Sequence, residues 1–237
     1  MERGIACGAL PFEVIAGAPF ARYGARVTLR HPSADGGAEL ARAFGFGAHP
    51  WGAPTWIGLR VRPGGELRAK AYHAIDRVDE RFELPREWPI DLYPVMASLD
   101  GDAIEIYLRK RGACDFGEFA ARCLEPLGAA PPDARPRPRA REHSLCVSLR
   151  RERGQIAAVS LYADWRALPR DADVERVWSA SLDERDRVAY QLALAGARST
   201  GFLPTGNWHA MLAWTVESDG ARHRAVSITV PAPRDAR

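Results

Sequence analysis

Short β-like runs occur in pairs along the chain, and this pairing limits the folds that it can adopt. The paired runs are residues 11–18 with 25–31, 55–62 with 66–75, 92–99 with 103–111, 143–151 with 155–164, and 208–218 with 223–232. The second pair is joined by Pro-Gly-Gly, and glycine reaches positive φ without a Cβ clash. Asp-Gly steps supply turn chemistry in the third and fifth pairs. The sequence therefore predicts ten strands in five antiparallel hairpins.

Helix-like segments lie between most of these hairpins. Apolar residues recur at helical intervals in 36–46 and 116–128, and 171–197 is typical of two consecutive helices. Segment 129–142 is too rich in Pro and Arg for regular structure, so we expect a flexible connector there. We expect residues 1–237 to form one α+β domain. Its architecture is either an open sheet with helices on one side or a closed barrel surrounded by helices.

One alternation pattern recurs in three of the predicted strands and favours the closed barrel. The polar and tyrosine pairs are Lys70 with Tyr72, Glu105 with Tyr107, and Ser160 with Tyr162. Each pair lies on one face, because successive side chains of a strand point to opposite faces. The other face is aliphatic in two of these strands, with Ile104, Ile106 and Leu108 in one and Val159 and Leu161 in the other.

An aliphatic face of this size has to be covered, since an exposed one favours aggregation. If helices cover it, the polar and tyrosine face lines the interior of a barrel. The competing interpretation is an ordinary sheet face in contact with solvent, where alternating cations and tyrosines are common.

Composition narrows the classes of function. The net charge of +3 is spread along the chain, whereas a nucleic-acid-binding protein concentrates cations on one face, so we expect no nucleic-acid partner. Lys70 and Lys110 are the only lysines, and this preference for arginine suggests a GC-rich bacterial genome. The four cysteines form no C-x-x-C pair, which fits a reducing cytoplasm. We find no segment typical of targeting or of a membrane span.

The sequence lacks the usual motifs of metal and nucleotide chemistry. The six histidines include no H-x-H or H-E-x-x-H, and there is no P-loop, G-x-G-x-x-G or G-x-S-x-G. The Asp-rich triplets at 100–102 and 171–173 fall at a predicted hairpin corner and a predicted helix start, where Asp has structural reasons to occur. We therefore expect no metal site.

The order of five hairpins, together with the strand "AKAYH" after a Gly-rich turn, resembles the ABBA aromatic prenyltransferases. This resemblance implies a PT barrel, which is a closed antiparallel barrel of ten strands with helices outside. It also implies transfer of an allylic prenyl group from a prenyl diphosphate to an indole, phenol or similar aromatic acceptor. The setting would be bacterial secondary metabolism in the cytoplasm, with no required cofactor and Mg²⁺ helpful at most.

The resemblance assigns roles to particular residues. Inward cations would hold the diphosphate, and the candidates are Lys70, Arg68, Arg60, Arg62, Arg30 and Arg109. Inward tyrosines would shield the allylic cation, and these are Tyr72, Tyr107 and Tyr162. Glu13 would be the base that removes the proton of the arene, because the family tends to place a carboxylate early in the barrel.

The chain departs from the family in ways that leave other functions open. Ser160 and Ser227 lie at substrate-binding positions where the family often carries Lys or Arg, so the diphosphate clamp is incomplete. An alternative is a PT-barrel-like protein that binds or transforms a hydrophobic small molecule without prenyl transfer. A third is an open-sheet interaction module, if the strands do not close.

Overall fold

The computed structural model describes part of the chain. It comprises residues 12–16, 24–29, 34–47, 49, 51–61, 67–78, 82, 91–100, 103–131, 144–164, 171–182, 184–199 and 208–230. The strands are β1 (Phe12–Ala16), β2 (Gly24–Leu29), β3 (Trp56–Val61), β4 (Leu67–Ala74), β5 (Leu92–Asp100), β6 (Ala103–Lys110), β7 (Leu145–Glu152), β8 (Gln155–Asp164), β9 (His209–Glu217) and β10 (Arg222–Val230). The helices are α2 (Ala34–Ala43), α3 (Phe116–Leu124), the short 3-10 helix η1 (Glu125–Leu127), α4 (Asp171–Ser181) and α5 (Glu184–Ser199).

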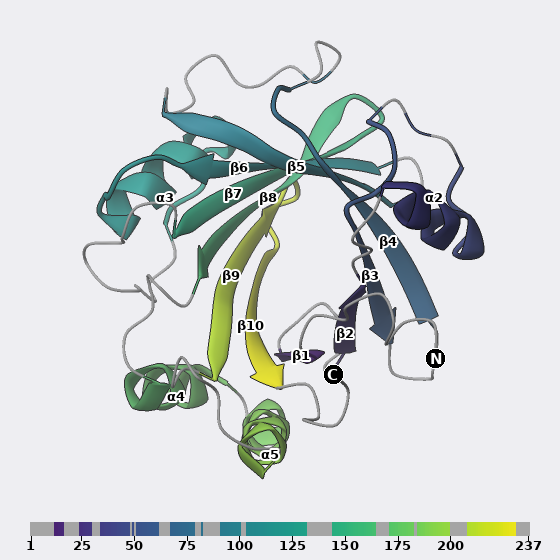
Figure 1. Ribbon diagram of the computed structural model, residues 1–237. Coiled ribbons are helices and arrows are strands. Elements are labelled where there is room, and N and C mark those ends of the chain that lie inside the picture. Colours follow the sequence, from purple (N-terminus) through teal and green to yellow (C-terminus); the bar gives the residue numbers. More distant parts are fainter. Residues whose placement is uncertain are drawn as a thin grey trace.

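The described strands form a closed antiparallel barrel in which each strand pairs with its neighbours along the chain (Figure 1). Pairing of β1 with β10 closes it, with Phe12 opposite Val230 and Ala16 opposite Val226. Closure removes the free edges that would otherwise pair with other chains. The antiparallel α+β architecture predicted from the sequence is confirmed, and the open-sheet alternative does not fit a sheet whose described strands close.

The apolar core lies outside the barrel wall, between the strands and the helices. Ile106 of β6 and Leu161 of β8 are fully buried in one cluster with Phe119 of α3. Helix α3 packs against β8. It begins at a capping residue, Asp115, whose side chain accepts a hydrogen bond from the backbone N–H of Glu118 at 3.0 Å. The aliphatic strand faces are therefore covered by helices, as the alternation predicts.

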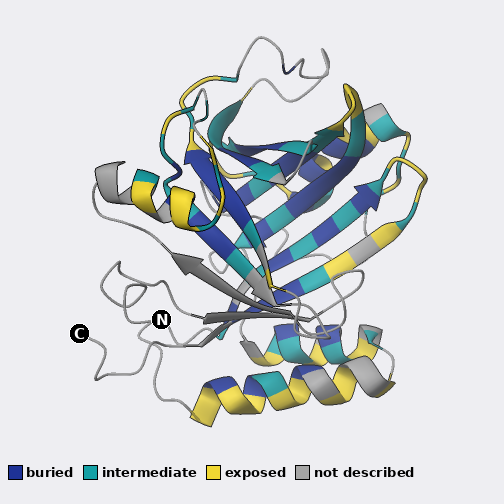
Figure 2. Cartoon of the chain, turned by 90° about the vertical axis from the view of Figure 1, so that its right-hand side faces the viewer, coloured by how far each residue is buried: buried dark blue, intermediate teal, exposed yellow. Residues whose placement is uncertain are grey.

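A second helical layer covers another part of the wall. Helices α4 and α5 carry buried residues on the side toward the barrel and exposed residues on the side away from it (Figure 2). Helix α5 contacts β1 and β10, and the hydroxyl of its Tyr190 lies 2.6 Å from Nε2 of His209 at the start of β9. This buried hydrogen bond ties α5 to the barrel.

The predicted helices occur where the periodicity places them. The run 36–46 overlaps α2, the run 116–128 contains α3 and η1, and 171–197 contains α4 and the greater part of α5. Within the predicted connector 129–142, residues 132–142 lie outside the described residues. Across the described part of the chain, no helix combines the length and the hydropathy needed to span a membrane.

Replacing Leu161 tests whether the layer outside the wall supplies the stability. Leu161 is 0% exposed, so Leu161→Ala should lower the free energy of unfolding by about 2 to 5 kcal/mol through lost burial and a residual cavity. The matched control is Leu192→Ala on α5, where Leu192 is 68% exposed and the change should stay within about 0.5 kcal/mol. Urea denaturation measures both. Equal losses in the two variants would contradict this account of the core.

Candidate active site inside the barrel

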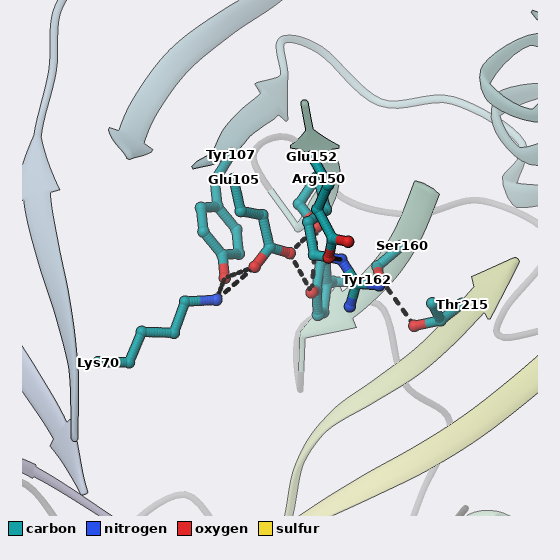
Figure 3. A network of polar contacts seen from close by, with 9 residues as sticks. Lys70, Glu105, Tyr107, Arg150, Glu152, Ser160, Tyr162 and Thr215 are labelled. Carbon is teal, nitrogen blue, oxygen red and sulfur yellow. Dashed lines mark hydrogen bonds and ion pairs between the residues drawn. The ribbon is translucent and has the colours of Figure 1, made fainter. Parts of the chain in front are cut away.

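A polar network fills part of the barrel interior and joins strands that are not neighbours in the sheet. Lys70 of β4 reaches across to Glu105 and Tyr107 of β6, although β5 lies between these two strands in the sheet (Figure 3). The alternate residues of β6, Ile106 and Leu108, pack in the outer cluster with Phe119 of α3, so Glu105 and Tyr107 point to the opposite, concave side of the sheet. These residues therefore face the interior, where alternation of side chains predicts them.

Glu105 is the centre of this network, and both of its carboxylate oxygens accept hydrogen bonds. Lys70 forms an ion pair with Oε2, which also accepts from the hydroxyl of Tyr107 at 2.8 Å. Ser148 of β7 donates to Oε1, and the hydroxyl of Tyr162 of β8 lies 3.4 Å from the same oxygen. We call these five residues the Glu105 network.

The network keeps a buried carboxylate ionised. Glu105 is 8% exposed, and burial by itself raises its pKa. The charge of Lys70 and the hydrogen bonds from Lys70, Ser148 and Tyr107 outweigh burial and lower that pKa to about 2. Burial, and next the negative charge of Glu105, raise the pKa of Tyr162, so its phenol stays protonated. The charge of Glu105 is thus balanced by the ammonium group of Lys70.

Three tyrosine rings form a row along the same side of the interior. The ring centroids of Tyr72 and Tyr107 are 6.0 Å apart, and those of Tyr107 and Tyr162 are also 6.0 Å apart. Nζ of Lys70 lies 5.4 Å from the centroid of Tyr72 and 5.8 Å from that of Tyr107, within the range of a cation–π contact. The charged end of Lys70 therefore lies beside two of the three rings.

Gly58 of β3 has no side chain, and the Tyr72 ring occupies the space where a side chain would lie. Gly58 is paired with Lys70 in the register of β3 and β4, and a Cβ built on it would lie 2.9 Å from Cε2 of Tyr72. The position of the Tyr72 ring therefore depends on a missing side chain on the neighbouring strand. Sequence reasoning did not identify Gly58, because nothing local distinguishes it from any other glycine in a strand.

Other polar side chains on this part of the wall contact one another. Ser160 and Thr215 share a hydrogen bond of 2.8 Å between neighbouring strands (Figure 3). Arg150, which is paired with Glu105 in the register of β6 and β7, contacts Glu217 at 2.9 Å and Glu152 at 3.0 Å. Ser160 was predicted to bind substrate. In this structure its hydroxyl is held by Thr215.

The structure brings together several of the predicted site residues and leaves the position of others undescribed. Lys70, Tyr72, Tyr107 and Tyr162 meet in the interior. Ser227 is buried on β10, opposite Ile15 of β1 and Met211 of β9. Arg109 is partly buried on β6, opposite Cys146, and its Nε is buried without a hydrogen-bond partner among the described residues. Their binding roles stay predictions.

The remaining candidates are described only by their backbone or not at all. Glu13 pairs with Arg26, Arg26 with Arg60, and Arg60 with Arg68, so these positions follow one another across β1 to β4. The side chains of these four residues lie outside the described residues. Arg30 and Arg62 lie outside them entirely. The four register positions form a row of three arginines next to one glutamate.

Sequence reasoning missed the central carboxylate. Glu105 belongs to the alternation pattern, yet it carries no predicted role, and Lys70 is expected to offer its charge to a ligand. In the structure the charge of Lys70 is balanced by Glu105. The signal that could have found this pair is the opposite charge of Lys70 and Glu105 at equivalent positions of two strands. No cluster of three or more metal-ligating side chains occurs among the described residues.

Comparison with solved structures identifies the fold. A 5-dimethylallyl tryptophan synthase from Streptomyces coelicolor, solved with DMASPP and Trp, matches with a TM-score of 0.63 and 19% identity over 94% of this chain and 80% of that chain. The prenyltransferase PriB matches with a TM-score of 0.60 and 18% identity over 95% and 83%. AnaPT from Neosartorya fischeri matches with a TM-score of 0.58 and 10% identity over 94% and 78%.

These likenesses concern the fold, because all three identities are low. The chain has the barrel fold of these solved structures, and the resemblance to the ABBA aromatic prenyltransferases is confirmed at that level. No protein-family model and no curated protein sequence matches the chain.

The buried carboxylate makes stability depend on pH in the acid range. The folded pKa of Glu105, about 2, lies below its ordinary value of 4.5, so its contribution is complete above about 4.5 and is lost as pH falls toward 2. The full contribution is about 3 kcal/mol. Between pH 5 and pH 3, urea unfolding of Glu105→Gln should therefore show a weaker pH dependence than that of the wild type. Glu118→Gln, at an exposed ion pair with Arg122, is the control and should keep the wild-type slope.

Filling the space beside Tyr72 should be costly. Gly58→Ala forces the Tyr72 ring or the β3 backbone to move, and overpacking of this kind lowers the free energy of unfolding by about 1 to 3 kcal/mol. Gly47→Ala is the matched control, since a Cβ at Gly47 meets nothing within 4 Å. Chemical denaturation of both variants measures the difference. If they are equally stable, Gly58 does not set the position of Tyr72.

Proposed function

We propose that the protein is an aromatic prenyltransferase that moves an allylic prenyl group from a prenyl diphosphate to an indole, phenol or similar acceptor. The observation that carries the proposal is the row of three tyrosine rings beside a lysine and a carboxylate, inside a barrel with the fold of known prenyltransferases. One structure with this fold contains DMASPP and Trp, and PriB was solved with L-tryptophan and dimethylallyl thiolodiphosphate.

The chemistry of prenyl transfer requires the groups that this interior contains. When the C–O bond of an allylic diphosphate breaks, the electron pair leaves with the diphosphate, and nearby cations stabilise the growing negative charge. Lys70 is such a cation, and the register positions of Arg26, Arg60 and Arg68 continue from its strand across β3 to β2. The allylic carbocation left behind is stabilised by tyrosine π-faces and protected from water by burial.

A carboxylate completes the reaction by accepting the proton of the arene. Once the prenyl carbon has bonded to the ring, the arenium ion is a much stronger acid than a carboxylic acid, so even a carboxylate of low basicity can accept its proton. Glu105 lies next to Tyr107 and Tyr162 and is the favoured base. The role predicted for Glu13 stays a prediction, because only its backbone is described.

The second candidate is a barrel that binds a hydrophobic aromatic molecule without prenyl transfer. The ion pair of Lys70 with Glu105 favours it, because a neutralised lysine attracts a diphosphate less strongly than a free one. The tyrosine row serves either function, as a shield for a cation or as packing surface for a ring.

We also propose that the protein is a ten-stranded PT barrel that acts in secondary metabolism in the bacterial cytoplasm, with Mg²⁺ helpful at most.

A transfer assay separates the two candidates. The wild type is incubated with dimethylallyl diphosphate and a panel of indoles and phenols, with and without EDTA, and products are detected by mass spectrometry. Tyr72→Leu removes one π-face while keeping apolar bulk, and it should lower turnover about thirtyfold, which corresponds to about 2 kcal/mol of cation–π stabilisation. Tyr72→Phe keeps the ring and should retain most of the turnover.

The loss of turnover in Tyr72→Leu is compared with the loss of donor binding in the same variant. Binding of dimethylallyl thiolodiphosphate to Tyr72→Leu should weaken less than turnover does, because the cation exists only after the donor ionises. Should the wild type bind indoles but form no prenylated product from any donor tested, the transferase proposal fails and the binding barrel replaces it.

A further inference from the structure

One oxygen of the Glu105 carboxylate, Oε2, has no free lone pair in the structure. Oε2 accepts hydrogen bonds from Lys70 and Tyr107, and Oε1 accepts one from Ser148. The hydroxyl of Tyr162 lies 3.2 Å from Oγ of Ser148 and 3.4 Å from Oε1, and it has one hydrogen to donate. Each oxygen of an ionised carboxylate offers about two lone-pair sites, so Lys70 and Tyr107 occupy both sites of Oε2. In this arrangement Oε2 cannot accept a hydrogen bond from a substrate unless Lys70 or Tyr107 leaves.

Lys70 is the donor that a substrate can remove. The other donor to Oε2 is the hydroxyl of Tyr107, which lies on β6 two residues from Glu105. Lys70 instead extends a flexible side chain from β4, where Arg68 is the next residue on its face and Arg60 is the cross-strand partner of Arg68. A diphosphate carries several negative charges, so it competes well with one carboxylate for the ammonium group.

We propose that Lys70 is shared between Glu105 and the diphosphate of the donor, so that donor binding frees an oxygen of Glu105 to accept a hydrogen bond from an N–H or O–H of the aromatic acceptor. This inference rests on the proposed function. It makes the two substrates cooperative, because the donor prepares the group that the acceptor needs. The coupling is reciprocal, so a bound acceptor also strengthens donor binding.

The electrostatics of the site agree with this coupling. Burial raises the pKa of Glu105, and the charge of Lys70 is the largest of the influences that oppose it. Withdrawal of Lys70 toward a diphosphate therefore raises the pKa of Glu105, and the negative charge of the diphosphate raises it further. Glu105 becomes a better proton acceptor when a donor is bound, which is when an arenium ion can form.

Calorimetric titration of indole with and without dimethylallyl thiolodiphosphate tests the coupling directly. We expect the thiolodiphosphate to increase the affinity of the wild type for indole roughly five- to 150-fold. With 1-methylindole, which has no N–H to donate, the affinity should not rise. Lys70→Met should bind indole without the thiolodiphosphate about as tightly as the wild type binds it with the thiolodiphosphate.

Lys110→Met is the matched control, because Lys110 is the other lysine of the chain and pairs with Asp91 instead of Glu105. It should keep the wild-type coupling. Since loss of a buried partner charge can prevent folding, Tyr107→Phe provides a second route: it vacates one lone pair of Oε2 without changing charge, so its affinity for indole alone should rise. Circular dichroism verifies that each variant is folded.

The outcomes separate this inference from the proposed function. If the thiolodiphosphate binds and the affinity for indole is unchanged, or rises equally for 1-methylindole, the shared-lysine proposal is wrong while prenyl transfer can still stand. An unchanged affinity of Tyr107→Phe for indole also contradicts the proposal. If the thiolodiphosphate does not bind to the wild type, the donor site is absent, and both the proposed function and this inference fail.

Discussion

The ion pair between Lys70 and Glu105 is the interaction on which the interior of this barrel depends. It joins β4 to β6 across the concave side of the sheet, and each of its two charges is almost fully buried. Removing two charges from water costs several kcal/mol per ion, and their attraction offsets that cost only when other groups satisfy the remaining donors and acceptors. The hydroxyls of Tyr107 and Ser148 do this for Glu105.

Because the interior of the barrel is polar, the burial of apolar side chains that stabilises the fold has to occur in another part of the protein. The buried aliphatic side chains of β6, β7 and β8 point outward, where α3 covers part of the wall and α4 and α5 cover another part. The two-residue period of a strand separates the two tasks, because alternate residues go to opposite faces. Ile106 contributes to the core, while its neighbours Glu105 and Tyr107 line the site. Substitutions of the interior site residues should therefore disturb the packing of the outer core less than the burial of those residues suggests.

Much of this arrangement could be predicted from local patterns. The hairpins follow from turn residues and alternation, and the same alternation predicts that Lys70 shares the interior with the three tyrosines of the row. The partner of Lys70 could not be predicted, because Glu105 is 35 residues away and the two meet only when the sheet curls. The role of Gly58 could not be predicted for the same reason. Its missing Cβ matters only because the Tyr72 ring lies against the neighbouring strand in the folded barrel.

The sequence by itself determined which residues alternate, where the chain turns, and which faces of the strands are polar or aliphatic. These properties are local: they depend on side-chain chemistry and on the period of the extended backbone. Tertiary structure alone decided that Lys70 is neutralised, that Glu105 is the central carboxylate, and that three tyrosine rings form one row. Those facts depend on register and closure, which place residues from non-adjacent strands within contact distance, and no short stretch of sequence contains that information.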